Sequence, residues 1–187
     1  MSNQDKVQKE SSDIHPSSVF EIRPATIEDV PLIHQLILEL AEFEKLLETC
    51  TTTPDLLALH LFGVGADPTH PQPTRSAHVL IATHTATKAA VGMALYFYNF
   101  STFTSKPGLY LEDLYIREPY RGQSLGSLFF DRLTAQAKSA GCARMEWTVL
   151  DWNQRARTFY QSLGAREMEG WTICRLDHNA LEKFPRK

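Results

Sequence analysis

The sequence predicts a mixed α/β domain, and two observations support this fold class. Helical and strand-like patterns are interleaved: two helices come early, three strands follow, and helices and strands then alternate. The chain has 187 residues, 43% of them hydrophobic, which is enough for one core without disulfide or metal support. The sequence contains no internal repeat. We therefore expect a disordered polar tail over residues 1–18 and a single domain over residues 19–187.

The first part of this domain is predicted to contain one strand and two helices. A short strand over residues 19–23 ends at Pro24, and a helix with apolar residues at helical spacing follows. The apolar residues of this helix are Val30, Ile33, Leu36, Ile37 and Leu40, followed by Phe43 or Leu47. A shorter helix is predicted over residues 56–62 after Pro54. Two glycines and three prolines predict a surface loop over residues 63–75.

The remaining elements follow from β-branched, aromatic and turn residues. Strands are predicted at residues 77–83, 91–100, 109–116, 144–150 and 171–176, with a turn at 106–108. A helix from the loop at 119–122 to about Ala140 places its apolar residues on one side: Leu125, Leu128, Phe129, Leu133 and Ala137. A last helix over residues 153–163 ends at Gly164.

Composition excludes several classes of function. The formal net charge is −3 without a Lys/Arg run, so we expect no nucleic-acid partner. The three cysteines, Cys50, Cys142 and Cys174, are widely spaced and predict reduced thiols in the cytoplasm. The seven histidines lack ligand spacing, so no metal is expected. No apolar run reaches about 18 residues, and residues 1–16 lack the apolar core of a signal peptide, so no membrane association is expected.

Residues 121–126 (RGQSLG) form the sharpest local motif, a glycine-bearing loop between a strand and a helix. Successive backbone N–H groups in such a loop can bind an anion, and the helix N-terminus adds partial positive charge. The segment is neither a P-loop nor a dinucleotide GxGxxG motif. Taken alone, it fits a phosphate site or merely a tight turn.

Two further patterns carry polar groups. Asn153 and Tyr160 are seven residues apart, nearly two helical turns, and could reach one elongated ligand or serve as a helix cap and a core residue. Glu112 and Asp113 lie inside an apolar strand, where adjacent side chains face opposite sides. A carboxylate held there would have a raised pKa and could act as a base, or it could simply face solvent at the strand end.

In this order the motifs resemble the GNAT superfamily of N-acetyltransferases, whose acyl-CoA loop reads Arg/Gln-x-x-Gly-x-Gly/Ala. Within it, the sequence is most similar to the spermidine/spermine acetyltransferase branch and its thialysine acetyltransferases. The resemblance is carried by residues 22–25 (IRPA), 40–46 (LAEFEKL), 109–115 (LYLEDLY), 120–122 (YRG), 149–153 (VLDWN), Phe159-Tyr160 and Gly164-Ala165. It implies a mostly antiparallel sheet flanked by helices, a homodimer, and acetyl-CoA as co-substrate.

The resemblance also implies roles for individual residues. The acetyl-CoA site would contain Leu114, Tyr115, Ile116, Arg121, Gly122, Gln123, Ser124, Leu125, Gly126, Ser127, Asn153, Ala156 and Tyr160. Tyr160 would be the general acid beside the thioester sulfur. Glu112 would accept the amine proton, and Phe43, Glu44 and Glu169 would lie near the amine substrate. None of the cysteines falls in these motifs, so we expect direct attack in a ternary complex.

The chain departs from the family loop at one position. Ser124 stands where the family has glycine. Serine keeps the backbone N–H, but a positive φ at this position would cost roughly 1–2 kcal/mol.

The leading hypothesis is therefore an acetyl-CoA-dependent N-acetyltransferase that acts on a primary amine of a small cationic substrate, such as thialysine or a polyamine. The acidic residues Glu44, Glu112 and Glu169 favour such a compact cation. A protein N-terminal or lysine acetyltransferase and a non-catalytic acyl-CoA-binding module are the alternatives.

Overall fold

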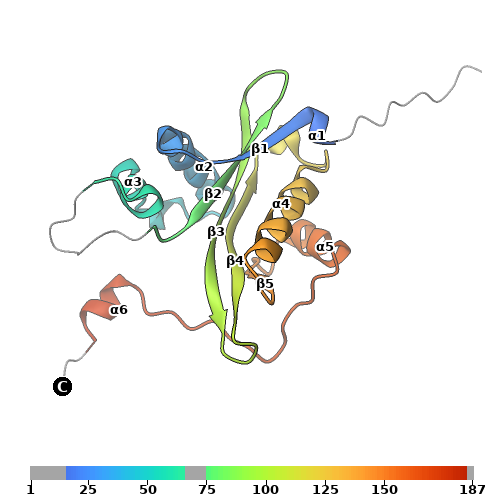
Figure 1. Cartoon of the computed structure of the whole chain (residues 1–187). Coiled ribbons are helices and arrows are strands. Elements are labelled where there is room, and N and C mark those ends of the chain that lie inside the picture. The colour runs from blue at the N-terminus through green and yellow to red at the C-terminus, as the bar shows by residue number, and fades with distance from the viewer. Residues whose placement is uncertain (1–15, 66–74, 185–187) are drawn as a thin grey trace, which may run out of the picture. The chain divides into compact units, whose positions relative to one another are not determined.

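A computed structural model describes residues 16–65 and 75–184 of the chain (Figure 1). The chain divides after Thr148 into two compact units, which are described separately. Of the predicted tail, residues 1–15 lie outside the described part, and the next four residues form α1 (Pro16–Val19). Most of the predicted loop over residues 63–75 also lies outside it.

The first unit is built on a five-stranded sheet in the order β1-β2-β3-β4-β5. Its strands are β1 (Phe20–Pro24), β2 (His78–His84), β3 (Ala90–Ser101), β4 (Lys106–Ile116) and β5 (Met145–Trp147). The first four strands are antiparallel, and β5 runs parallel to β4. The predicted mixed, mostly antiparallel sheet is therefore confirmed.

Two predicted boundaries in this sheet are wrong. β5 has three residues instead of the seven predicted over 144–150. The predicted turn at residues 106–108 belongs to β4, because these residues pair with Ser101, Phe100 and Asn99, and the turn lies at residues 102–105. This part of β4 includes a proline and a glycine. A side chain does not fit at Gly108, because a Cβ there would lie 2.3 Å from Asn99 Oδ1.

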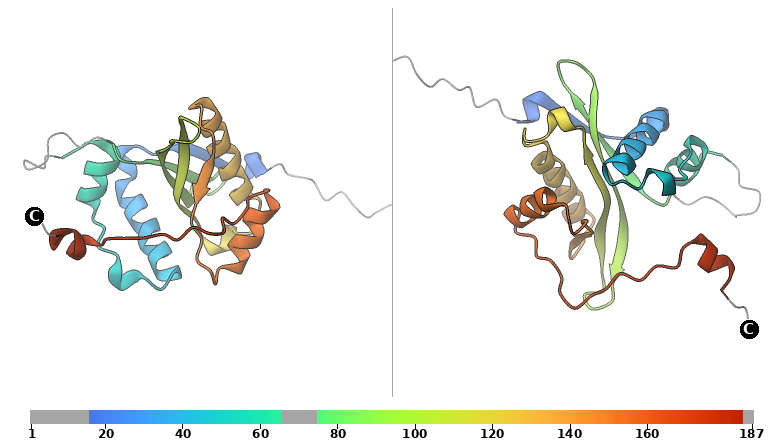
Figure 2. Two further views of the ribbon diagram at one scale, coloured as in Figure 1. Left: turned by 90° about the horizontal axis from the view of Figure 1, so that it is seen from below. Right: turned by 180° about the vertical axis from the view of Figure 1, so that it is seen from behind.

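Helices cover both faces of the sheet. The helices α2 (Val30–Phe43) and α3 (Pro54–Phe62) lie on one face and α4 (Leu125–Ser139) lies on the other (Figures 1 and 2). The core under α2 and α3 contains Ala25, Ile33, Leu36, Leu61, Ala77, Val79, Ile81, Met93 and Tyr115. On the α4 side, Leu125, Phe129, Phe130, Leu133 and Ala137 are buried, as the helical spacing predicts, except that Phe130 takes the place of half-buried Leu128.

Short 3₁₀ turns connect these elements. They span Ile27–Asp29, Leu47–Thr49 and Glu118–Tyr120. The third turn leads from β4 into the loop that precedes α4. In the described part of the chain, no helix is both long and apolar enough to cross a membrane.

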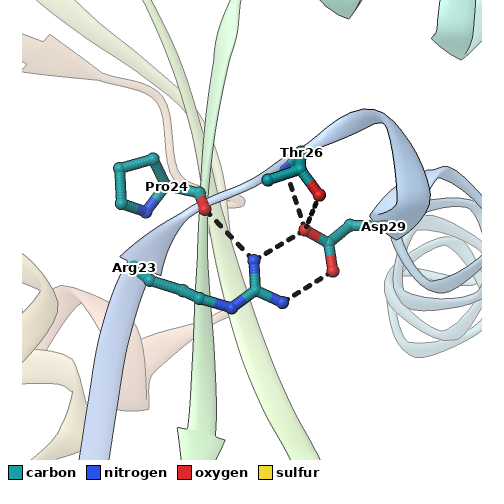
Figure 3. A network of polar contacts seen from close by, with 4 residues as sticks. All are labelled: Arg23, Pro24, Thr26 and Asp29. Atoms are coloured by element: carbon teal, nitrogen blue, oxygen red, sulfur yellow. Dashed lines mark hydrogen bonds and ion pairs between the residues drawn. The ribbon is translucent and has the colours of Figure 1, made fainter.

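A buried carboxylate joins β1 to the start of α2. Asp29, 8% exposed, accepts two hydrogen bonds of 2.7 Å from the guanidinium of Arg23 (Figure 3). It also accepts from the backbone N–H of Thr26 at 2.8 Å, as part of a capping box at the start of the 3₁₀ turn Ile27–Asp29 that leads into α2. The bond from Arg23 is the main cause that lowers the pKa of Asp29, so the pair is ionised at neutral pH.

The second unit contains α5 (Gln154–Ser162) and α6 (His178–Glu182). α5 is held to the following segment by two hydrogen bonds of 2.8 Å from Arg157 to Glu167. The predicted strand over residues 171–176 is wrong: the described part of this unit offers no strand with which it could pair, and Trp171 and Ile173 are exposed. α6 was not predicted, and its one sequence signal is the cap at Asp177, whose carboxylate accepts from Ala180 N.

Candidate active site

The loop between β4 and α4 has the backbone geometry of an anion site. Gly122 has φ of 79°, and Ser124, the residue before the helix, has φ of 61° and ψ of 8°. α4 begins at Leu125, so the N–H groups of its first turn have no acceptor within the helix. The carbonyl of Ser124 accepts from Leu128 N at 3.1 Å, which fixes the loop to the helix. Left-handed residues next to a helix N-terminus direct N–H groups toward an anion.

Ser124 has the positive φ that the sequence raised as a possibility. Its side chain is exposed and makes no capping bond to the helix, so no local hydrogen bond offsets the steric cost of about 1–2 kcal/mol. A turn residue of the same type, Ser105, has a similar φ of 52° between β3 and β4. Both residues are therefore candidates for stabilisation by glycine.

Arg121, the first residue of the loop motif, contacts protein groups on three sides. Its Nε donates to the carbonyl of Ile116 at 2.7 Å. Its guanidinium lies 4.8 Å from the ring centroid of Phe43 and 5.8 Å from that of Tyr115. The start of the loop is thus joined to the end of β4 and to the last residue of α2.

β4 carries an extra residue in its ladder with β3. Leu111 pairs with Tyr96, whereas Asp113 pairs with the next residue of β3, Leu95, so Glu112 is the additional residue of a β-bulge. Because paired residues share a face, Leu111 and Asp113 lie on opposite faces although they are two apart. The bulge therefore puts Asp113 on the face of α2 and α3, whereas Glu112 has no partner in this ladder, so the prediction that the two side chains face opposite sides stays a prediction.

Asp113 has two other carboxylates, Glu112 and Glu44, in its electrostatic surroundings. Burial, together with the negative charges of Glu112 and Glu44, raises the pKa of Asp113 to about 6. Burial also raises the pKa of Glu44, which caps the C-terminus of α2. Glu112 is exposed. The sequence suggested a raised pKa for a carboxylate in this strand, and the structure gives this raised pKa to Asp113. No pattern in the sequence indicates the bulge that places Asp113 on the face of α2 and α3.

β4 loses one of its neighbours beyond the bulge. β5 pairs only with Leu109, Tyr110 and Leu111. Among the described strands, Leu114–Ile116 therefore has a neighbour only in β3, and its other edge can offer backbone groups to a ligand. On the β3 side the fit is close, because a Cβ on Gly92 would lie 2.5 Å from the Tyr115 carbonyl oxygen.

The second unit holds the other predicted polar residues. Asn153 caps α5, and its Oδ1 accepts from Ala156 N at 3.2 Å, so the capping interpretation is confirmed. Burial raises the pKa of Tyr160 to about 12, so the phenol stays protonated at neutral pH. Glu169 is exposed between α5 and α6. In the described part of the chain, no three His, Cys, Asp or Glu side chains are grouped to hold a metal ion.

A large part of the chain, including the loop before α4, matches a known protein family. The model of the acetyltransferase (GNAT) family matches residues 39–165, more than half of the chain. The chain belongs to the GNAT family. This match confirms the resemblance, the fold class and the prediction of an N-acetyltransferase.

Curated members of the GNAT family are similar over most of the chain. An L-ornithine N5-acetyltransferase from Arabidopsis thaliana is 32% identical, over 86% of each chain. A thialysine N-epsilon-acetyltransferase from Bos taurus is 34% identical, over 89% of this chain and 97% of its own. An integron cassette protein from the mobile metagenome of V. cholerae has a similar fold, with a TM-score of 0.69 at 23% identity, over 88% of this chain and 96% of that one.

Ser124→Gly and Ser105→Gly make the same chemical change at two left-handed residues of this GNAT chain. Each should raise the free energy of unfolding by about 0.5–1 kcal/mol, since relief of strain outweighs the entropy of glycine. Only Ser124→Gly should tighten acetyl-CoA, by up to about tenfold, because it removes a Cβ from the anion loop. Thermal unfolding and calorimetry measure the two effects. Weaker binding by Ser124→Gly would show instead that the hydroxyl donates to the phosphate.

Proposed function

We propose that this GNAT enzyme transfers an acetyl group from acetyl-CoA to a primary amine of a small cationic substrate, such as thialysine, ornithine or a polyamine. The observation that carries the proposal is the set of three carboxylates formed by Glu112 and Asp113, on the strand that leads into the anion loop, and Glu44, at the end of α2. Three carboxylates favour a compact cation, and the curated relatives are named for ornithine and thialysine. The homodimer stays a prediction from the family resemblance, and the cytoplasmic location stays a prediction from the widely spaced cysteines.

The residues present fit the chemistry of acetyl-CoA, which would supply an acetyl group activated as a thioester. The N–H groups of residues 122–127 would bind the pyrophosphate, and the helix N-terminus adds partial positive charge. The unpaired edge of Leu114–Ile116 would bind the pantetheine arm. For Asn153 and Ala156, a role in binding the pantetheine arm stays what the family resemblance implies.

The main barrier on the amine side is a proton. An alkylammonium has a pKa of about 10.4, so near pH 7.4 only about one molecule in 10³ is neutral, which corresponds to about 4 kcal/mol. We assign the proton to the pair Glu112 and Asp113, with exposed Glu112 meeting the ammonium group and Asp113 holding the proton. A pKa of about 6 leaves Asp113 ionised at pH 7.4, yet makes it a stronger base than an ordinary aspartate.

On the leaving-group side, Tyr160 would act as a hydrogen-bond donor to the sulfur. With a pKa of about 12, it is a weaker acid than a thiol, whose pKa is about 8.5. Complete proton transfer would be uphill by about 5 kcal/mol, because each pKa unit corresponds to about 1.4 kcal/mol. Tyr160 would therefore stabilise the developing charge without giving up its proton.

An amine panel tests the proposed reaction. Release of CoA from acetyl-CoA should depend on added thialysine, ornithine or spermidine, because the carboxylate cluster favours small cations. A lysine-containing peptide should cause little release of CoA from acetyl-CoA. Turnover of the peptide above the small amines would favour a protein acetyltransferase, and acetyl-CoA binding without turnover of any amine would favour a non-catalytic module.

Asp113→Asn and Glu112→Gln separate the two carboxylates. Wild-type kcat/KM should fall as pH drops through about 6, where Asp113 takes up a proton and can no longer accept one from the amine. Asp113→Asn should abolish this acid limb of the pH profile and lower activity at pH 7.4 by about 10²-fold. The activity of the variant should recover as the pH rises toward the pKa of the amine. Glu112→Gln should mainly raise the KM of the amine.

Glu146→Gln is the matched control, since Glu146 lies on neighbouring β5 and is already paired with Arg144 at 2.8 Å. It should leave the pH profile unchanged. If the acid limb of the pH profile persisted in Asp113→Asn and disappeared in Glu112→Gln, the group that accepts the amine proton would be Glu112.

Tyr160→Phe should lower kcat by about 10²-fold with little change in the acetyl-CoA dissociation constant, because the hydroxyl acts in the transition state. Steady-state kinetics and calorimetry give the two values. Tyr98→Phe is the control, since its hydroxyl only accepts a hydrogen bond from Gln136. An unchanged kcat in Tyr160→Phe would remove this residue from the acid role.

A further inference from the structure

We propose that Arg121 is a positioning residue that couples the anion loop to the end of α2, and that it does not bind the phosphates of acetyl-CoA. The proposal rests on the proposed function for its two ligands, an acyl-CoA at the loop and a cationic amine at the carboxylates. It reverses the role that the family resemblance implies for Arg121.

The side chain of Arg121 makes its contacts within the protein. Nε donates to the Ile116 carbonyl at 2.7 Å, which directs the guanidinium back along β4. The plane then lies over Phe43 at 4.8 Å and near Tyr115 at 5.8 Å, within the range of cation–π contacts. Arg121 is half-buried among these groups, whereas the next three residues of the loop are exposed.

Phe43 is the last residue of α2, and the adjacent Glu44 is one of the three carboxylates around Asp113. The position of Glu44 therefore depends on the ring that Arg121 covers. One helical turn earlier, Glu39 accepts hydrogen bonds of 2.9 and 2.7 Å from Arg117, which also binds the Ala90 carbonyl at 2.8 Å.

Together these contacts fix the last turn of α2 to the end of β4 at two points. Arg117 holds Glu39, and Arg121 holds Phe43. Only the second point includes a residue of the anion loop. Displacement of Arg121 should therefore disturb both the loop, through Gly122, and the amine side, through Glu44, whereas loss of a phosphate ligand would disturb the loop alone.

The molecule contains a matched control. Arg75 has the same pair of contacts: its Nε donates to the Ala77 carbonyl at 3.2 Å, and its guanidinium lies 5.7 Å from the ring centroid of Phe62. This pair lies at the end of α3, outside the anion loop and the carboxylate cluster. Arg75→Met removes the same kind of contact without touching the proposed sites.

The test measures the KM of thialysine at saturating acetyl-CoA and the dissociation constant of acetyl-CoA in the absence of amine. Arg121→Met and Phe43→Leu should each raise the KM of thialysine about threefold to tenfold, and the double variant should not exceed the larger single effect, because both remove one contact. Arg121→Lys should behave like Arg121→Met, since lysine keeps the charge but loses Nε and the planar guanidinium. Arg75→Met should change neither constant.

A phosphate ligand would give a different pattern. Arg121→Met would then weaken acetyl-CoA alone and reduce the salt dependence of its binding, Arg121→Lys would retain most of the affinity, and the effects of Arg121→Met and Phe43→Leu would be additive. This pattern would overturn the proposal. Thermal unfolding of the single and double variants tests the contact independently of ligands: additive losses of stability would overturn it, even if wild-type protein bound no acetyl-CoA and the proposed function failed.

Discussion

The polar groups of the candidate site take their positions from one extra residue in β4. Because Leu111 and Asp113 pair with consecutive residues of β3, Glu112 has no partner of its own, and the strand changes face at this point. Without the bulge, Asp113 would lie on the α4 side with Leu111, away from Glu44. The raised pKa of Asp113 thus follows from strand register, which places a carboxylate among apolar neighbours and next to two others.

The same strand explains why the anion loop and the carboxylates belong together. β4 bends at the bulge, loses β5 as a neighbour, and ends at Ile116, whose carbonyl binds Arg121. α2 approaches this end from the Asp113 side and is fixed there by Arg117 and Arg121. The proposed cation site and the proposed anion site would therefore both adjoin the last five residues of β4.

The sequence predicted the elements with strong periodicity and missed those set by pairing. The spacing of apolar residues predicted α2 and α4, and the motif order predicted the family. Pairing partners decide the short β5, the missing strand over residues 171–176 and the bulge at Glu112, and no local pattern encodes them. Asp113 was accordingly considered as a base but not chosen, whereas the strained φ of Ser124 could be anticipated, because the family places glycine there.

Gly92 limits how this sheet can vary or move. A methyl group there would meet the Tyr115 carbonyl oxygen at 2.5 Å and the Ile116 Cα at 3.2 Å, so β3 and β4 are in contact without room for a side chain. Any substitution must push the two strands apart, and no rotamer avoids the collision, since both obstacles are backbone atoms. Position 92 should be among the least tolerant of substitution in the chain, although it touches no ligand in the proposed reaction.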